Sequence, residues 1–346
     1  MKVRHILSTL SGDVTQYKLP AVLTPVFVVL EVLMEVLIPF VIADLIDKGV
    51  EMGNYAVVAE DGVILIILAL LALLFGIIAG KTSADASAGF AKNLRRAVFT
   101  NVQKFSFANI DKYSPPSLIT RMTTDITNIQ NSFMMMIRVA IRSPVMFLAS
   151  FIMVLIIKPE MALIFAAVVP ILGIGVGFLT VKTFPIFERV FKKYDSLNAV
   201  VRENIRGIRV VKSFVRESFE KKKFKTASAD IYTEFVTAEK LMALMSPLMQ
   251  FCVYLCIIMI SLVGGQMIVF GDFTKGELIS VISYTMQILM SFMMVAMVIV
   301  MITMARASAI RITEVLDEVP TVTNPENPVT EVAVGSVSFE NVSFSY

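Results

Sequence analysis

The sequence is poor in the side chains that bind metals or form disulfides. It contains one histidine and two cysteines in 346 residues. Cys252 and Cys256 lie four residues apart in one apolar run, where a framework of disulfides is not expected. One histidine and two such thiols are too few for a typical zinc site. The net charge of +3 is too small to indicate nucleic-acid binding.

The sequence also has no phosphate-binding loop of the form G-x-x-x-x-G-K-[ST]. The nearest segment, residues 76–82, has its glycines four positions apart rather than five. This segment ends an apolar run instead of joining a strand to a helix. We therefore expect no ATP hydrolysis by these residues alone.

Charge is absent from long stretches that could cross a hydrocarbon core of about 30 Å as helices. Four stretches have no charged residue: 62–80, 161–181, 241–271 and 278–305. Two further runs are interrupted by a few charges, which are Glu31, Glu35 and Asp44 in 20–46, and Arg138 and Arg142 in 133–157. The runs are continuous rather than alternating, which argues against a membrane β-barrel. The sequence predicts an all-α membrane protein with six transmembrane helices.

The connections between these runs differ strongly in basic residues. Residues 82–132 contain six Lys and Arg and residues 182–240 contain fourteen, whereas each opposite connection contains one. Because basic segments stay in the cytoplasm, we expect both long stretches and both termini there. We expect a multi-pass protein of the plasma (cell inner) membrane whose basic residues also contact the lipid bilayer.

Both basic stretches are predicted to be long cytoplasmic helical extensions. Between Pro185 and Pro247 there is no other proline, and Gly207 is the only glycine, so the second hairpin should turn near Gly207. Pro115 and Pro116 mark the turn of the first, because two prolines cannot continue a helix interior. Each tip mixes apolar and charged side chains. Either the hairpins pack on each other or a soluble partner domain docks there.

The composition changes after Arg306. Three prolines between 320 and 328 mark a linker. Residues 337–346 alternate apolar and polar side chains, a pattern typical of a β-strand, which cannot fold alone. We expect a membrane domain at 1–319, a linker at 320–336 and the beginning of a soluble domain at 337–346.

Three segments, 118–130, 203–217 and 306–317, together resemble the half-transporters of the ABC exporter family. In this family six spans precede a nucleotide-binding domain, whose first strand residues 337–346 resemble. The resemblance implies ATP and Mg, held in that domain and not by this chain alone. It also implies a second half-transporter, identical or different, and export of a small amphipathic substrate, such as a drug, lipid or peptide, by alternating access.

The resemblance further implies roles for the tips, which match the two coupling helices that sit in grooves of nucleotide-binding domains. The residues implied are Phe107, Asp111, Tyr113, Gly207, Ile208, Arg209, Val210, Val211, Lys212 and Phe214. Tyr346 matches an aromatic residue that stacks on adenine, with an ordinary strand residue as the alternative. Pro116 stands where many members have glycine, which leaves the detailed turn of the first tip open.

Two features of the spans are candidates for a substrate path. Glu31 and Glu35 share one helical face, and carboxylates inside a membrane are costly and commonly functional. They would attract a cationic amphipathic substrate, or else Glu31 pairs with Arg142. A stripe of flexible side chains on the last span lines the path or forms a packing seam. The stripe includes Met286, Met290, Met293 and Met297.

Two other functions remain open on the sequence. An ATP-independent secondary transporter would have short loops and an ion site in broken helices. A regulatory membrane scaffold would use the hairpins only to bind partners. The long hairpins favour the ABC exporter.

Overall fold

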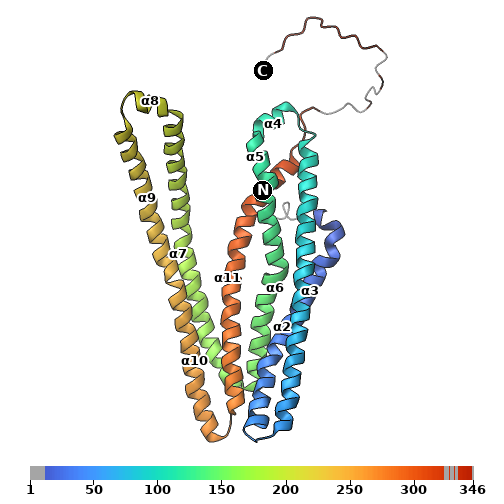
Figure 1. Cartoon of the computed structure of the whole chain (residues 1–346), viewed down its shortest axis with the longest axis vertical. Helices are drawn as coiled ribbons and strands as arrows, with labels where there is room; N and C mark the ends of the chain where they lie inside the picture. The colour runs from blue at the N-terminus through green and yellow to red at the C-terminus, as the bar shows by residue number, and fades with distance from the viewer. Residues whose placement is uncertain (1–11, 323–326, 328–330, 332–333, 345–346) are drawn as a thin grey trace. The chain divides into compact units, whose positions relative to one another are not determined.

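The structure is a computed structural model that describes residues 12–322, 327, 331 and 334–344. Every regular element among these residues is helical (Figure 1). Six helical segments are long and apolar enough to cross a membrane, as judged by length and composition. The predicted fold class, an all-α membrane protein with six spans, is confirmed.

The elements follow one another with short connections. In chain order they are η1 (Gly12–Tyr17), α2 (Lys18–Asp44), η2 (Leu45–Val50), α3 (Tyr55–Val102), α4 (Phe107–Tyr113), α5 (Pro115–Thr120), η3 (Arg121–Asp125), α6 (Ile126–Ile157), α7 (Pro159–Arg206), α8 (Ile208–Ser213), α9 (Glu217–Ala243), α10 (Met245–Phe270) and α11 (Lys275–Asp317). Helices α3 and α7 have 48 residues each. At 1.5 Å per residue each is about 72 Å long, more than twice the thickness of a hydrocarbon core. The predicted helical extensions are therefore present.

The chain divides into two compact units. The first unit consists of residues 1–22, 82–136 and 299–346, and the second of residues 23–81 and 137–298. Each unit has its own cluster of buried apolar side chains. In the first unit, Leu94 and Val98 of α3 pack with Ile126 of α6 and Ile312 of α11.

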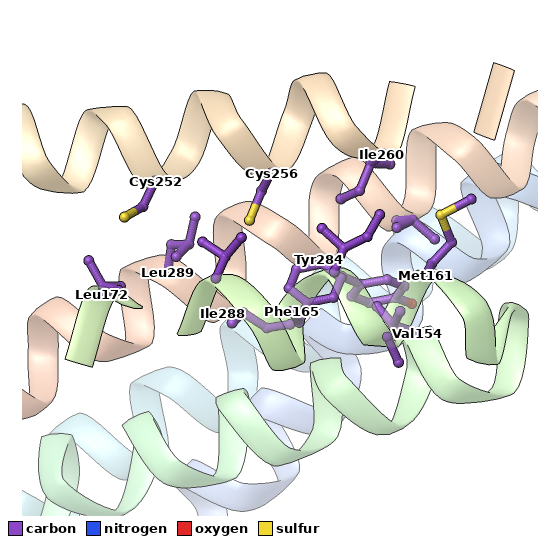
Figure 2. Close-up of a cluster of buried hydrophobic side chains, with 14 of the residues drawn as sticks. Val154, Met161, Phe165, Leu172, Cys252, Cys256, Ile260, Tyr284, Ile288 and Leu289 are labelled. Atoms are coloured by element: carbon purple, nitrogen blue, oxygen red, sulfur yellow. The ribbon is translucent and has the colours of Figure 1, made fainter. Parts of the chain in front are cut away.

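The core of the second unit gathers side chains from several helices (Figure 2). Phe165 and Leu172 of α7 are buried with Tyr284 and Ile288 of α11. Cys252 and Cys256 of α10 are buried in the same core as free thiols. This packing holds α2, α7, α10 and α11 together, and α2 and α11 carry the candidate residues of the substrate path.

Helix α2 contains Pro39, which has no backbone N–H to donate. The Tyr284 hydroxyl donates to the Val36 carbonyl at 2.7 Å, and the Ser280 hydroxyl donates to the Pro39 carbonyl. Both α11 side chains are fully buried. The two hydroxyls need such acceptors in a membrane domain, because lipid supplies none. These hydrogen bonds therefore join α11 to α2 around Pro39.

The first turn of α11 lies very close to α2. A Cβ on Gly276 would collide with the Ala43 carbonyl oxygen and stand 2.7 Å from Oδ2 of Asp47. We expect Gly276→Ala to lower the free energy of unfolding by about 1–3 kcal/mol, because backbone atoms must shift. The measurement is the apparent Tm of the purified chain in detergent.

The matched control is Gly265→Ala in α10, where nothing lies within 4 Å of the added Cβ. An alanine there should leave the apparent Tm unchanged or raise it slightly, because alanine favours helix more than glycine does. Equal melting of the two variants would show that α2 and α11 are less tightly packed than described.

Helices α7 and α9 form the predicted second hairpin and run side by side, with α8 across their common end (Figure 1). Helix α7 ends at Arg206, and Gly207 follows it as predicted. Ion pairs join the two arms, namely Arg189–Glu234 at 3.2 Å, Lys193–Asp230 at 3.1 Å and Lys223–Glu203 at 2.6 Å.

The strand expected at 337–346 is not observed. The described residues 334–344 form no regular element, and residues 337–344 are exposed. A lone extended segment has no neighbouring strand to accept and donate its backbone hydrogen bonds. Apolar alternation therefore does not produce a strand in this chain by itself.

Candidate functional site

Three charged side chains meet within the second unit. Nη1 of Arg142 on α6 lies 2.6 Å from Oε1 of Glu31 on α2. Nη2 of Arg142 donates to both oxygens of Glu35, at 2.8 and 2.6 Å. The pairing of Glu31 with Arg142, one of the two interpretations of the sequence, is confirmed. The pairing of Glu35 with the same guanidinium was not anticipated.

The two carboxylates are unequal in their hydrogen bonding. Glu31 is only 8% exposed, and its Oε2 is buried without a hydrogen-bond partner among the described residues. Gly76 of α3 lies against this carboxylate, because a Cβ there would stand 3.1 Å from Oε1 and 3.7 Å from Oε2. The cluster therefore combines two acids and one guanidinium inside apolar segments, with one acceptor left open.

The methionine stripe on α11 is exposed. Met286, Met290, Met293 and Met297 are between 43% and 60% exposed. No described helix covers these side chains as a packing seam within this chain would. They present a flexible apolar surface, which can adapt to lipid, a partner or a ligand.

The second tip is apolar and open. No residue of α8 is buried, and Phe214, just after it, is 74% exposed. A groove of about 440 Å³ lies between the end of α7, α8 and the start of α9. Its lining includes Ile208, Val211 and Lys212 among the residues predicted for this tip. The Lys212 ammonium pairs with Glu217 Oε1 at 3.0 Å, so α8 is tied to α9.

Val215 ends this tip with an unusual backbone. Its φ is +53°, a left-handed value that a β-branched residue rarely adopts. Its side chain is 77% exposed. The remaining predicted residues of the tip, Gly207, Arg209 and Val210, lie at the end of α7 and on α8 without being buried.

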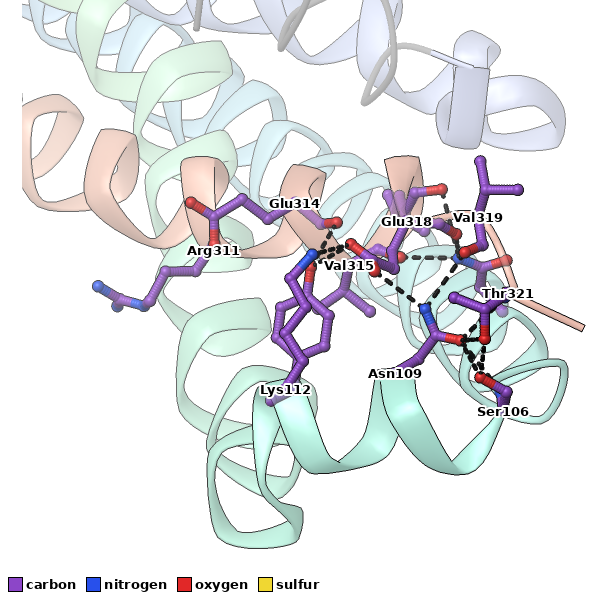
Figure 3. A network of polar contacts seen from close by, with 12 residues as sticks. Ser106, Asn109, Lys112, Arg311, Glu314, Val315, Glu318, Val319 and Thr321 are labelled. Atoms are coloured by element: carbon purple, nitrogen blue, oxygen red, sulfur yellow. Dashed lines mark hydrogen bonds and ion pairs between the residues drawn. The ribbon is translucent and has the colours of Figure 1, made fainter. Parts of the chain in front are cut away.

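Asn109 is the centre of a polar network at the first tip (Figure 3). It is 1% exposed. Its amide nitrogen donates to Glu318 Oε1 at 2.9 Å and to the Val319 carbonyl at 3.2 Å. Its oxygen accepts from the backbone N–H of Ser106 and of Thr321, both at 3.2 Å. One side chain therefore caps α4 and holds the segment that follows α11.

The second turn of α4 binds the same segment. The Lys112 ammonium and the Tyr113 hydroxyl donate to Glu318 Oε2, at 2.7 and 2.8 Å (Figure 3). The hydrogen bond from Lys112, followed by that from Tyr113, lowers the pKa of the Glu318 carboxyl. Of the residues predicted for this tip, Tyr113 contacts its own chain. Phe107 is 88% exposed, and Asp111 is exposed as well.

Further polar contacts join η3 to α11. Asp125 is 1% exposed and accepts from Ser308 Oγ at 2.9 Å and Arg311 Nε at 2.8 Å. Arg121 pairs with Glu314 Oε2 at 3.2 Å. Sequence reasoning did not name these residues. The signal was present, because segments 118–130 and 306–317 carry charges of opposite sign that can pair.

The aromatic residue predicted to stack on adenine, Tyr346, lies outside the described residues.

Comparison with known proteins decides the family. The model of the ABC transporter transmembrane region matches residues 22–308. The chain belongs to the ABC transporter family. This ABC transporter chain is 28% identical over 330 residues to the ABC transporter ATP-binding protein YfiB of Bacillus subtilis, covering 95% of the chain and 57% of that protein.

Two mycobacterial relatives of the ABC transporter chain are similarly distant. The ABC transporter ATP-binding protein MT1311 of Mycobacterium tuberculosis is 29% identical over 99% of the chain and 59% of its own length. The fatty acid ABC transporter ATP-binding/permease protein of Mycobacterium bovis is 29% identical over 73% of the chain and 40% of its own length. The chain thus spans less than two thirds of these relatives, whose names include ATP binding.

Proposed function

We propose that the chain is the membrane-spanning half of an ATP-driven exporter. It moves amphipathic or hydrophobic substrates out of the cytoplasm by alternating access. Two halves, identical or different, enclose one pathway, and each works with a nucleotide-binding domain that holds ATP and Mg. Membership of the ABC transporter family supports the ATP-driven part, and the resemblance to exporters supports the direction.

The proposal includes a location and a domain plan. The excess of Lys and Arg in 82–132 and 182–240 favours a plasma-membrane orientation with both termini in the cytoplasm. Residues 1–319 form the membrane domain and 320–336 a linker. Residues 337–346 are the first part of a nucleotide-binding domain.

The observation that carries the proposal is the second tip. Helix α7 continues for 25 residues from the uncharged run 161–181 to Arg206, a length of about 37 Å. Helix α8 lies at the end of this extension of α7 and exposes apolar side chains. A tip that is surrounded only by solvent would not be expected to carry them. A nucleotide-binding domain seated on α8 would transmit its movement along α7 into the span.

The substrate path in this proposal runs past Glu31, Glu35 and the four methionines of α11. The methionine face is exposed and deformable, which suits substrates of varied shape. Both tips act in coupling to the nucleotide-binding domains. Phe107 and Asp111 form the outward part of the first tip, and α8 with Phe214 forms the second.

The test is a double substitution at the second tip, Val210→Asp with Phe214→Asp, in the transporter assembled with its nucleotide-binding domains. Two carboxylates on the docking face should reduce ATP-driven transport about ten-fold or more, because desolvating them costs several kcal/mol. ATP hydrolysis should persist but no longer respond to substrate. Transport into inverted membrane vesicles and phosphate release are measured together.

The control is Tyr232→Asp, an exposed aromatic residue on α9 away from the tip. It should leave the transport rate and the substrate response of hydrolysis unchanged. Normal coupled transport by the double variant would count against docking at α8.

A further inference from the structure

We infer that Glu318, in the segment that follows α11, is a positioning residue for the first tip. Its carboxylate sets the face that α4 presents to a nucleotide-binding domain. The inference rests on the proposed function and adds the residue that orients one of its docking helices. All of the contacts that carry it lie within the first unit of the chain.

The rotation of α4 about its axis is not fixed by the chain on either side. With seven residues, the helix is too short to be stable by itself. Residues 103–106 before it are not helical, and Ser114 after it has a φ of +57°. Side-chain contacts must therefore hold α4 in one orientation.

Helix α4 has two faces of different character. Asn109 is followed by Lys112 and Tyr113 at three and four positions, so the three side chains share one face. All three bind Glu318. Phe107 lies on the opposite face and is 88% exposed. Because successive residues are about 100° apart around a helix, a slip of one position would turn Phe107 away from its outward direction.

The Glu318 carboxylate accepts hydrogen bonds from three different groups (Figure 3). Oε1 accepts from the Asn109 amide at 2.9 Å, and Oε2 accepts from the Lys112 ammonium at 2.7 Å and the Tyr113 hydroxyl at 2.8 Å. Both oxygens of a carboxylate are acceptors, whereas an amide would direct a donor of its own at one of these groups. The side chain of Glu318 is only 16% exposed, so water shields these contacts weakly.

The ring of Tyr113 is held by further contacts. The Phe105 ring is stacked with it at a centroid distance of 6.0 Å, and the guanidinium carbon of Arg121 lies 4.9 Å from its centroid. Its hydroxyl also donates to the Glu314 carbonyl of α11 at 3.3 Å. Stacking and cation–π contacts restrict the ring. The hydroxyl therefore remains directed to the end of α11.

The backbone that carries Glu318 is fixed from α3. Nδ2 of Asn101 donates to the carbonyls of Val315, Leu316 and Glu318, at 2.7, 3.3 and 3.2 Å. The last carbonyls of a helix have no partner within the helix, so this amide caps α11. Glu318 thus stands at a defined place, from which its carboxylate can orient α4.

The experiment measures the orientation of α4 in the purified chain in nanodiscs. Nitroxide labels on Asp111→Cys and Ala307→Cys, two exposed positions of α4 and α11, report their separation by double electron–electron resonance. Dilution with unlabelled chain limits the signal to pairs within one molecule. Cys252 and Cys256 are fully buried and should not react with the label. We expect one narrow distance distribution.

Charge reversal tests the contact. Glu318→Lys and Lys112→Glu each place like charges together, so each should broaden the distribution. The double variant restores an ion pair of opposite polarity, whose ammonium can also donate to the Tyr113 hydroxyl. It should recover most of the narrow distribution, as residues in contact do in a double-mutant cycle. Lys92→Glu, at an exposed position of α3, is the matched control and should leave the distribution unchanged.

The same variants are then measured in the transporter assembled with its nucleotide-binding domains. Each single reversal should abolish the response of ATP hydrolysis to substrate, and the double variant should restore it. Lys92→Glu should keep the full response. A purely structural role would lower the yield or the apparent Tm without separating hydrolysis from substrate.

A narrow distribution in both single variants would overturn the inference, as would a double variant as broad as the single ones. A broad distribution with an unchanged substrate response would overturn the role of Glu318 in docking. If the unaltered transporter shows no ATP-driven transport, the proposed function fails, and the label distances still decide whether Glu318 orients α4.

Discussion

Arg142→Leu is expected to lower the free energy of unfolding by about 3–5 kcal/mol, because it leaves two carboxylates without their shared counter-ion. The side chains of Glu31, Glu35 and Arg142 are 11%, 29% and 22% exposed, so solvent screens them weakly. Size-exclusion chromatography and apparent Tm in detergent measure the effect. We expect a low yield of monodisperse protein and a clearly lower Tm.

The triple variant Glu31→Gln, Glu35→Gln, Arg142→Leu separates charge from packing. It has no charge left in the cluster and side chains of similar size, a replacement that is often neutral for stability. It should therefore recover most of the loss. If Arg142→Leu melts as the unchanged chain does, the carboxylates are solvated, and the cluster is not the buried arrangement described here.

Asn109→Ala is the second substitution with a large expected effect. It removes the acceptor for the N–H groups of Ser106 and Thr321 and the donor to Glu318 and Val319. We expect a loss of about 1–2 kcal/mol, since the cap of α4 and the hydrogen bonds to the segment after α11 are lost together. Hydrogen exchange of the Thr321 amide should become about ten-fold faster or more.

Two further variants sharpen this test. Asn109→Asp keeps an acceptor for Ser106 but places a carboxylate against Glu318, so α4 should stay capped while residues 318–321 detach. Asp111→Ala, on the exposed side of α4, should leave exchange at Thr321 unchanged. Unchanged exchange in Asn109→Ala would mean that Lys112 and Tyr113 hold the segment without Asn109.

The membrane spans and the second hairpin were predictable because their causes are local. Uncharged runs define spans wherever they occur, and Gly207 is the sole glycine between Pro185 and Pro247. The turn of the first hairpin was also predictable from two adjacent residues. Pro115 and Pro116 occupy the first two positions of α5, where a missing N–H costs little.

The side-chain clusters were not predictable in the same way. Arg142 and Glu35 are 107 positions apart, and Asn109 and Glu318 are 209 apart, so no periodicity relates them. The cap at Ser106 also escaped notice, because its partner at the third helical position is Asn109 rather than the usual Glu or Gln. The resemblance placed α4 as a tip helix, but only the structure shows that Tyr113 faces its own chain.

The contact of α11 with α2 around Pro39 has a consequence for water. The hydroxyls of Tyr284 and Ser280, which are fully buried, donate to the Val36 and Pro39 carbonyls. If α2 and α11 part at this level, these hydroxyls lose their acceptors, and hydrocarbon offers no replacement. Each unpaired hydroxyl would then cost several kcal/mol. Any gap that opens between these two helices near Pro39 must therefore be a hydrated one, filled as it forms.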